Sequence, residues 1–525
     1  MRRSYVWMSV PVVAVIAAAM ALPSSGSVHG DATAAYGPFG FTTKGMGHGP
    51  SYGEPSMIWA PDGKHGVICT PGGANTKGDT STVQYWYTSD GGKTFTHSTS
   101  DGGAQAGGDC DVDYLPGGVA ISADLEISDS VIQMTTDWGK TWKKVGTAGA
   151  EQDRQWFAHS NDGKTLFLVY HDFAAEAEFF AKGTYDPQQK TVSFPAQGCC
   201  NTAQSANQAS APGIAPTPLN APSLIDEGGN TFSGPILVDP SDKDSKKLYV
   251  IYSISDSQSN MNPKDGVPPY GPTRAVIVAY SSDGGTTWTS HYAVQAKPAL
   301  DGSTEAAEGA IFPWGSVDAK GTVYVVYNST EGTVGNHFHQ YYRYSKDHGT
   351  TWSKPVKLDK LGMNTGASVY ANSDAAGKGL LDVVWYQSNN GTPDSTSKSV
   401  TWTPHFAQIT NADTGKPKIV EQAITTIPNH HGGVCLQGIL CGIGPGSGDR
   451  SLLDYFQVSI NPRTHMAGIA YADNAGMRPG GVSGEVVFAQ QTKVPGKKSH
   501  GIVFFAPLAV LPAMLRLRRR RLVAV

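Results

Sequence analysis

The chain has 525 residues, more than one hydrophobic core can serve, so it folds as a repeat architecture or divides into domains. Its 62 glycines, 33 prolines and 16% charged residues favour short strands and tight turns over long surface helices. The net charge of −4 implies no broad basic surface, and we expect no nucleic-acid partner.

The N-terminus has the features of an export signal. Arg2 and Arg3 precede an apolar run over residues 10–22, and Ala32-Thr33-Ala34 fits a small-x-small cleavage site. This order predicts a signal peptide over residues 1–34, with an N-terminal membrane anchor as the alternative.

A short phrase recurs four times with the pattern Ser/Thr-x-Asp-x-Gly-x-Thr-Trp/Phe, at residues 88–95, 135–142, 281–288 and 345–352. Asp and Gly favour a tight turn, because Gly takes a positive φ freely and the Asp side chain bonds nearby amides. The Thr and the aromatic residue begin a returning strand. Each phrase therefore predicts a β-hairpin.

A second pattern, an apolar strand, a polar turn and a stronger apolar strand, occurs seven times. The copies begin at Glu54, Asp111, Asp153, Phe232, Gly309, Gly366 and Asp454. Each would be the inner hairpin of a four-stranded blade, with the first phrase as the outer hairpin. The chain is thus expected to be an all-β β-propeller with seven blades, or six as the alternative count.

The third, sixth and seventh repeats lack a clear copy of the turn phrase. Residues 485–490 read as a third strand of the last blade, and a strand near residues 39–43 would complete that sheet and protect its edge. Inserted loops are expected at residues 196–230, 389–399 and 430–448.

The C-terminus carries an apolar run over residues 501–515, followed by Arg516 and four consecutive arginines at 518–521. This order predicts a surface anchor with a basic cytoplasmic tail, the alternative being a disordered basic tail. The predicted division is a signal peptide (1–34), a propeller (36–492), a linker (493–500) and an anchor (501–525). The protein would be exported and held at the cell surface through residues 501–521.

Six cysteines in an exported chain allow up to three disulfides. Cys435 and Cys441 are close enough in sequence to close a small loop, and Cys69 and Cys110 lie near the starts of neighbouring repeats. The spacing does not determine the pairing. A metal site that joins Cys435 and Cys441 to His430 and His431 is a weaker alternative.

The turn phrase resembles the Asp box of the sialidase-like (BNR-repeat) superfamily. The resemblance implies a β-propeller whose Asp boxes lie away from the active face, and a glycan or glycoconjugate as partner. Surface proteins and, through the anchor, the membrane are further expected partners.

In a propeller the inner strands begin around one mouth of the central channel, which is the usual place for a pocket. Acids and arginines recur there in this chain: Glu54, Asp109, Asp111, Asp153, Arg154, Glu308, Asp449, Arg450, Asp454 and Tyr455. The carboxylates could bind a cation such as calcium or serve as an acid/base pair on a glycosidic bond. The competing interpretation is that each acid bonds the backbone of its own loop.

Sialidases of this superfamily hold the substrate carboxylate with three arginines and use a Tyr–Glu pair and an Asp for catalysis. Carried over by position, the candidate catalytic residues are Asp153, Arg154, Glu308, Arg450, Asp454 and Tyr455, with Tyr455 paired to Asp454 or Glu308. The chain departs from the pattern because no Arg lies between Arg3 and Arg154. Two functions follow: a glycoside hydrolase of the exo-α-sialidase type, or a non-catalytic surface propeller that binds glycans or proteins.

Overall fold

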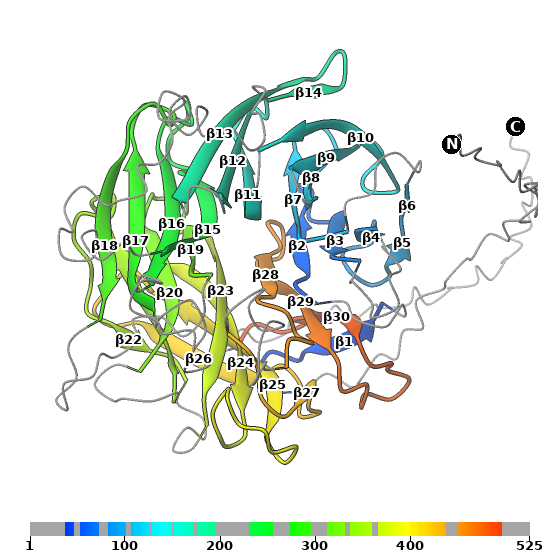
Figure 1. The fold of residues 1–525 in the computed structure, drawn as a ribbon, viewed down its shortest axis with the longest axis vertical. Coiled ribbons are helices and arrows are strands. Elements are labelled where there is room, and N and C mark those ends of the chain that lie inside the picture. The colour runs from blue at the N-terminus through cyan, green and yellow to red at the C-terminus, as the bar shows by residue number, and fades with distance from the viewer. Residues whose placement is uncertain are drawn as a thin grey trace, which may run out of the picture.

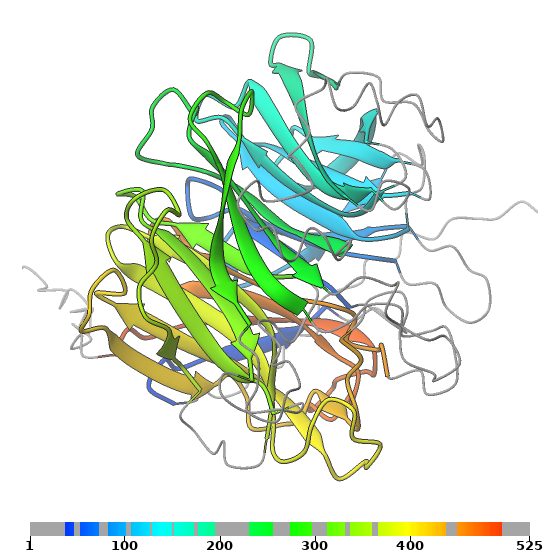
Figure 2. The ribbon, with the colours of Figure 1, turned by 60° about the vertical axis from the view of Figure 1, so that its left-hand side comes forward.

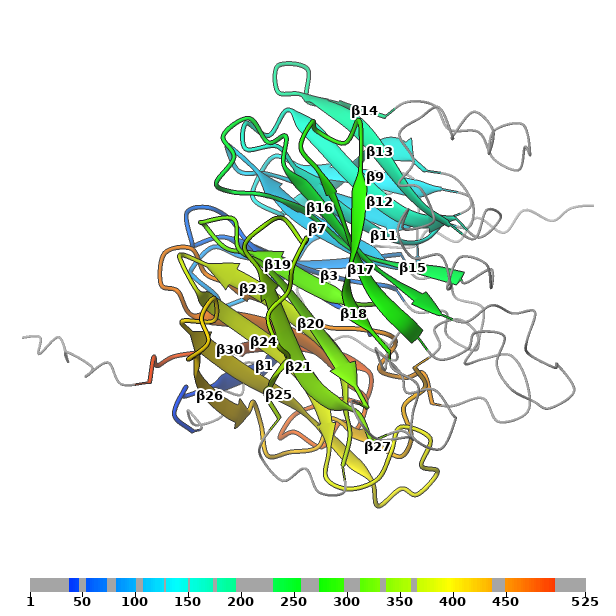
Figure 3. The same cartoon turned by 90° about the vertical axis from the view of Figure 1, so that its left-hand side faces the viewer.

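The computed structural model describes residues 37–46, 53–72, 82–100, 107–126, 129–149, 152–172, 177–194, 230–255, 273–296, 312–330, 337–359, 366–436 and 449–495. The described chain is all-β and forms seven sheets arranged as a β-propeller (Figure 1). The predicted fold class and the count of seven blades are confirmed. Figure 2 and Figure 3 show from two other sides how the twisted sheets of neighbouring blades pack against each other.

The first four blades follow one another along the chain, each built from antiparallel neighbours. Blade 1 contains β2 (Ser56–Trp59), β3 (Gly66–Thr70), β4 (Gln84–Thr88) and β5 (Thr96–His97). Blade 2 contains β7 (Cys110–Leu115), β8 (Val119–Leu125), β9 (Ser130–Thr135) and β10 (Thr141–Ala148), and β6 (Thr99–Ser100) adds to it in parallel with β10. Blade 3 contains β11 (Gln152–His159), β12 (Thr165–Asp172), β13 (Ala177–Asp186) and β14 (Thr191–Ser193). Blade 4 contains β15 (Asn230–Val238), β16 (Leu248–Ser255), β17 (Thr273–Ser281) and β18 (Thr289–Gln295).

The remaining blades repeat this order until the last sheet. Blade 5 contains β19 (Trp314–Val317), β20 (Val323–Ser329), β21 (His339–Ser345) and β22 (Val356–Lys357). Blade 6 contains β23 (Ser368–Ala376), β24 (Leu380–Ser388), β25 (Thr401–Thr410) and β26 (Lys418–Ala423), with β27 (His430–His431) paired to β25. Blade 7 contains β28 (Gln457–Ile460), β29 (Ala467–Asp473), β30 (Glu485–Gln490) and the N-terminal β1 (Thr42–Gly45).

Strand β1 closes the ring, and it lies beside β30 in Figure 1. Thr42 is opposite Gln490 in an antiparallel pair, so the last sheet joins both ends of the domain. We expected this strand near residues 39–43. It begins at Thr42 because the preceding residues Phe39 and Phe41 pack into the hydrophobic core. Phe39 and Phe41 are buried and meet the Phe406 ring edge-on, with ring centroids 4.8 and 5.2 Å apart.

The four copies of the turn phrase form the same structure, between the third and fourth strands of blades 1, 2, 4 and 5. In the second copy, Asp137 Oδ1 accepts hydrogen bonds from Thr135 Oγ1 (2.8 Å) and the Thr141 amide (2.9 Å), and Gly139 has a φ of 93°. The strands of a blade alternate in direction, so the third strand ends where the inner strand ends. These turns therefore lie at the opposite end of the propeller from the mouth where the inner strands begin.

Large aromatic residues fill the space between and inside the blades. Trp59, Trp86, Trp156, Trp314 and Trp385 are all buried. Trp156 meets the Trp314 ring edge-on at 4.6 Å, which joins the inner strands of blades 3 and 5. The start of the predicted 389–399 insertion follows β24 directly, and no strand is assigned between β24 and β25.

Cys69 and Cys110 form a disulfide with a Cα–Cα distance of 6.3 Å, which joins β3 of blade 1 to β7 of blade 2. Cys435 is also disulfide-bonded. Cys199, Cys200 and Cys441 lie outside the described residues, as do the predicted signal peptide, the predicted anchor and most of the 196–230 insertion. Within the described ranges no helix is long and apolar enough to cross a membrane.

Candidate functional site

The structure brings most of the sequence-predicted residues to the mouth where inner strands begin. Arg154 lies on β11, and Arg450, Asp454 and Tyr455 lie in the segment that leads into β28. Asp153 is on β11 opposite His171. Glu308 lies outside the described residues.

Arg154 is fully buried among residues of three blades. Its Nη2 donates to the Tyr455 hydroxyl and, at 3.3 Å, to the Cys110 carbonyl oxygen. The guanidinium carbon lies 3.9 Å from the centroid of the Trp156 ring and 4.3 Å from that of the Tyr455 ring. A cation held between two aromatic faces and a carbonyl binds blades 2, 3 and 7 together.

Tyr455 shares this arrangement and is 2% exposed. Its hydroxyl donates to the Cys110 carbonyl oxygen at 3.1 Å. Burial raises the pKa of Tyr455 well above its usual range, although the Arg154 charge opposes the rise. The Tyr455 hydroxyl thus contacts Arg154 and a backbone carbonyl. The sequence paired it with Asp454 or Glu308, and Glu308 lies outside the described residues.

Arg450 and Asp454 form an ion pair, with 2.8 Å between Nη2 and Oδ2. The Arg450 side chain is 29% exposed and the Asp454 side chain 2%, so the guanidinium covers the carboxylate from the solvent side. Burial raises the pKa of Asp454, and Arg450 opposes that rise. Within the described chain, Arg450 Nη1 and Asp454 Oδ1 are buried without a hydrogen-bond partner.

Glu54 lies at the centre of the acidic residues. It is fully buried, and its Oε1 accepts a 2.8 Å hydrogen bond from the Asp454 amide. Burial, together with the negative charges of Asp109 and Asp454, raises the pKa of Glu54 well above its usual range. Glu54 therefore keeps its proton to a higher pH than a solvated glutamate, next to the half-buried Asp109.

Three bulky residues at this mouth have left-handed backbone conformations: Glu54 (φ 45°), Tyr370 (φ 58°) and Leu453 (φ 57°). Such conformations are unfavourable for residues with a Cβ, and they concentrate at functional sites. Tyr370 is the third residue of the inner strand of blade 6, and its hydroxyl donates to the Cys435 carbonyl oxygen at 2.5 Å. Sequence reasoning missed Tyr370, because nothing in its local pattern separates it from other strand tyrosines.

Two other predicted mouth acids have structural partners. Asp111 Oδ1 lies 2.9 Å from Ser56 Oγ, and its Oδ2 accepts from the Phe157 amide at 2.8 Å, so it connects blades 1, 2 and 3. Asp449 Oδ1 accepts from the Ser451 amide at 2.9 Å, within its own loop. The own-loop interpretation agrees with the contacts of Asp449, whereas Asp111 bonds residues of the two neighbouring blades.

The weaker metal hypothesis involved His430. Both of its ring nitrogens have partners, Asn474 Oδ1 at 2.9 Å and the Gly433 carbonyl oxygen at 2.7 Å. In the part of the chain that the structure describes, no group of three or more His, Cys, Asp or Glu residues is arranged to hold a metal ion. The contacts of His430 are those of a loop-stabilising residue.

The site is thus a buried cluster of carboxyl groups, with a half-exposed arginine, at one mouth of a seven-bladed propeller. No protein-family model matches the chain, and no curated protein matches it. Among solved structures, it is similar to the alpha-L-arabinanase of Penicillium chrysogenum complexed with arabinobiose (12% identity, 73% of this chain and 92% of that chain, TM-score 0.37). It is also similar to a PL25 ulvan lyase bound to a GlcA–Rha3S unit (8% identity, 83% and 93%, TM-score 0.42) and to NanB with Optactamide (11% identity, 89% and 69%, TM-score 0.36). Likeness at these values assigns neither a family nor a substrate to the chain.

Proposed function

We propose that this protein acts on glycans at the propeller mouth, by acid/base chemistry on a glycosidic bond. The observation that carries the proposal is Glu54, a buried carboxyl group with a raised pKa beside the half-buried Asp109 and the Arg450–Asp454 pair. Sites that cleave glycosidic bonds by acid/base chemistry hold carboxyl groups close together in this way.

The residues divide into those that meet the ligand and those that position them. Asp109 and Arg450 are partly exposed and would contact the glycan. Asp109 would donate a proton to the leaving glycosidic oxygen while water adds to the anomeric carbon and its released proton restores Asp109, and Arg450 would donate hydrogen bonds to the glycan. Glu54 is a positioning residue, because it is fully buried and acts through Asp109 and Asp454. Asp153 and Glu308 remain candidate catalytic residues on the strength of the sequence alone.

The test is turnover on a broad panel of chromogenic glycosides and polysaccharides. Asp109→Asn should lower kcat at least about 100-fold, as expected for loss of an acid/base group, with an unchanged melting temperature. Asp244→Asn, on an exposed turn at the opposite end of blade 4, is the matched control and should leave turnover unchanged. Turnover that persists in both Asp109→Asn and Asp454→Asn would overturn the proposal.

The location belongs to the same proposal. Export through residues 1–34 and anchoring through residues 501–521 would hold the propeller at the cell surface, where glycoconjugates are available. Fractionation of cells that express the full chain tests this, with deletion of residues 501–525 expected to release the protein into the medium. Retention of the truncated chain in the cytoplasm would contradict it.

A non-catalytic glycan-binding propeller is the second candidate. It is favoured by the burial of Arg154 and Tyr455, which are bound to each other and to Cys110, as scaffold residues would be. This function predicts glycan binding without turnover, with affinity reduced by Arg450→Met. Turnover abolished by Asp109→Asn would exclude it.

A further inference from the structure

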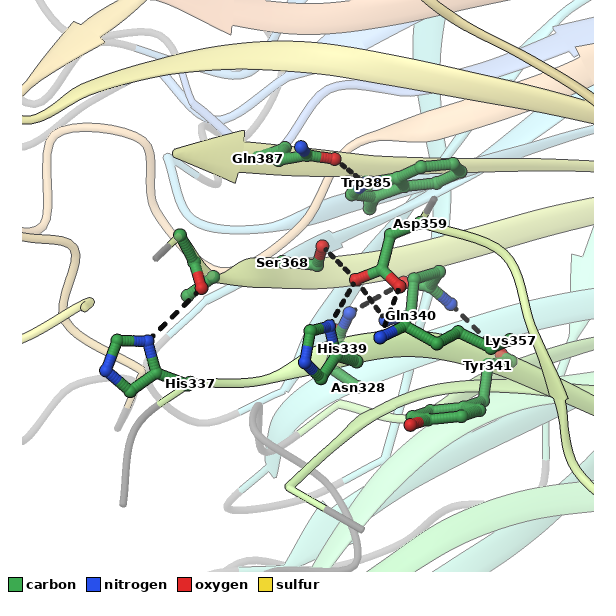
Figure 4. A network of polar contacts seen from close by, with 12 residues as sticks. Asn328, His337, His339, Gln340, Tyr341, Lys357, Asp359, Ser368, Trp385 and Gln387 are labelled. Carbon is green, nitrogen blue, oxygen red and sulfur yellow. Dashed lines mark hydrogen bonds and ion pairs between the residues drawn. The ribbon is translucent and has the colours of Figure 1, made fainter. Parts of the chain in front are cut away.

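Two histidines, His337 and His339, lie two residues apart at the start of β21 in blade 5, and Figure 4 shows that each ring contacts a different acceptor. His339 begins β21, which runs in the same direction as the inner strand, so its start is at the mouth end of the propeller. Phe338 is buried, whereas His337 is exposed and the His339 side chain is 22% exposed. This alternation directs both imidazoles away from the core.

The buried Asp359 fixes the orientation of His339. Asp359 is fully buried, and its Oδ2 accepts from the Gln340 amide at 2.9 Å, from Ser368 Oγ at 2.9 Å and from His339 Nδ1 at 3.2 Å. Because the amide and the hydroxyl both donate, this oxygen is an acceptor, and Nδ1 of His339 carries the proton. Nε2 of His339 is then left with its lone pair.

His337 has the same arrangement with a weaker acceptor. Its Nδ1 lies 3.3 Å from the Gly366 carbonyl oxygen, which can only accept. Nδ1 therefore carries the proton in this contact, and Nε2 of His337 also has a free lone pair. Histidines that bind metals in proteins nearly always donate their other ring N–H to a carboxylate or a backbone carbonyl.

We propose that His337 and His339 bind a divalent transition-metal ion of the Zn²⁺ type through their Nε2 atoms. Residues two apart in an extended chain lie about 7 Å apart, which lets two imidazoles converge on one ion with bonds of about 2.0–2.1 Å. His337 is exposed, so its ring can turn toward His339 when it gives up the 3.3 Å contact with Gly366. Imidazole donors select such ions over Ca²⁺, which prefers oxygen ligands.

The site has two protein ligands. Since no described group of three or more His, Cys, Asp or Glu residues converges on one point, the remaining coordination positions belong to water or to an oxygen atom of a bound molecule. The site is on the mouth side of the propeller and is independent of the proposed glycan chemistry. Its test therefore needs metal binding alone.

The experiment is calorimetric titration of the chelator-treated full chain with ZnCl₂, and with CoCl₂ followed by visible absorption. His337→Ala and His339→Ala should each weaken binding at least about tenfold, and Asp359→Asn about 10–100-fold through loss of the orienting acceptor. His465→Asn is the control: His465 is exposed in the turn between β28 and β29 at the opposite end, and Asn tolerates its φ of 56°. CaCl₂ should not compete.

Equal zinc binding by wild type and by the His337→Ala/His339→Ala double variant would overturn the proposal, as would the absence of binding by wild type. The two histidine variants change exposed or half-exposed side chains, so they keep the test decisive if Asp359→Asn fails to fold.

Discussion

The backbone amide of Asp454 donates a 2.8 Å hydrogen bond to Glu54 Oε1, between residues 400 positions apart in the chain. The same boundary between blades 7 and 1 includes Gln457 Oε1, which accepts from the Met57 amide at 2.9 Å. Glu54, the acid at the centre of the candidate site, therefore also makes one of the hydrogen bonds that close the propeller ring. Substitutions of Glu54 test both roles.

Glu54→Ala should destabilise the fold by about 2–3 kcal/mol, because it leaves the buried Asp454 amide without an acceptor. Glu54→Gln retains a carbonyl oxygen at that position and should cost less than about 1 kcal/mol. Urea unfolding of the two variants measures the difference. An equal loss of unfolding free energy in both variants would show that Glu54 does not stabilise the fold through this hydrogen bond.

The Cys69–Cys110 disulfide should stabilise the propeller by roughly 4 kcal/mol, since it closes a loop with a sequence separation of 41. Cys110 also supplies the carbonyl oxygen that holds Arg154 and Tyr455. We expect the Cys69→Ala/Cys110→Ala double variant to melt several degrees below wild type in non-reducing buffer. If wild type and the double variant melt at the same temperature, the disulfide makes no net contribution to stability.

Asp124 should make stability depend on pH. Burial raises its pKa to about 7, although hydrogen bonds from Ser122 and Tyr85 oppose the rise. The ordinary Asp pKa of 3.8 describes the unfolded chain, so the folded state binds more protons between these two pKa values and stability falls as pH rises from about 4 to 7. The predicted loss is roughly 4 kcal/mol across that range.

Asp124→Asn should remove this part of the pH dependence. Melting temperatures at pH 5 and pH 8 measure it: wild type should fall more than the variant, and the exposed Asp244→Asn variant should follow wild type. Parallel behaviour of Asp124→Asn and wild type would contradict the prediction.

The stabilisation of its turn by Asp283 should depend on pH in the opposite sense to that of Asp124, because the pKa of Asp283 is lowered. Hydrogen bonds, led by that from the Thr287 hydroxyl, lower the pKa of Asp283 to about 2, so its contribution is present above the unfolded value of 3.8 and is lost as pH falls toward 2. Asp283→Ala should cost about 1–2 kcal/mol at pH 7, at the low end because the carboxylate is solvent-exposed. Asp244→Ala, in the same blade, should change stability by less than about 0.5 kcal/mol. Equal effects of the two at pH 7 would refute the assignment.

Local chemistry allowed the sequence by itself to predict much of the fold. The hairpins depend on contacts within a few residues, as in the bonds from Thr135 and Thr141 to Asp137. Counting the repeated inner hairpins yielded seven blades, and the apolar segment near residue 40 indicated the closing strand, three residues before its actual start. These features are determined by turn residues and by the alternation of apolar side chains.

Only the tertiary structure decided what the mouth residues do. The sequence placed Glu54, Arg154, Asp454 and Tyr455 at the starts of inner strands, but ring closure decided that Glu54 meets Asp454 and that Arg154 meets Tyr455. Arg154 is buried where it contacts residues of neighbouring blades, and burial raises the pKa of Glu54. The exposure and the electrostatic environment of these side chains depend on residues hundreds of positions away, so no local sequence pattern predicts them.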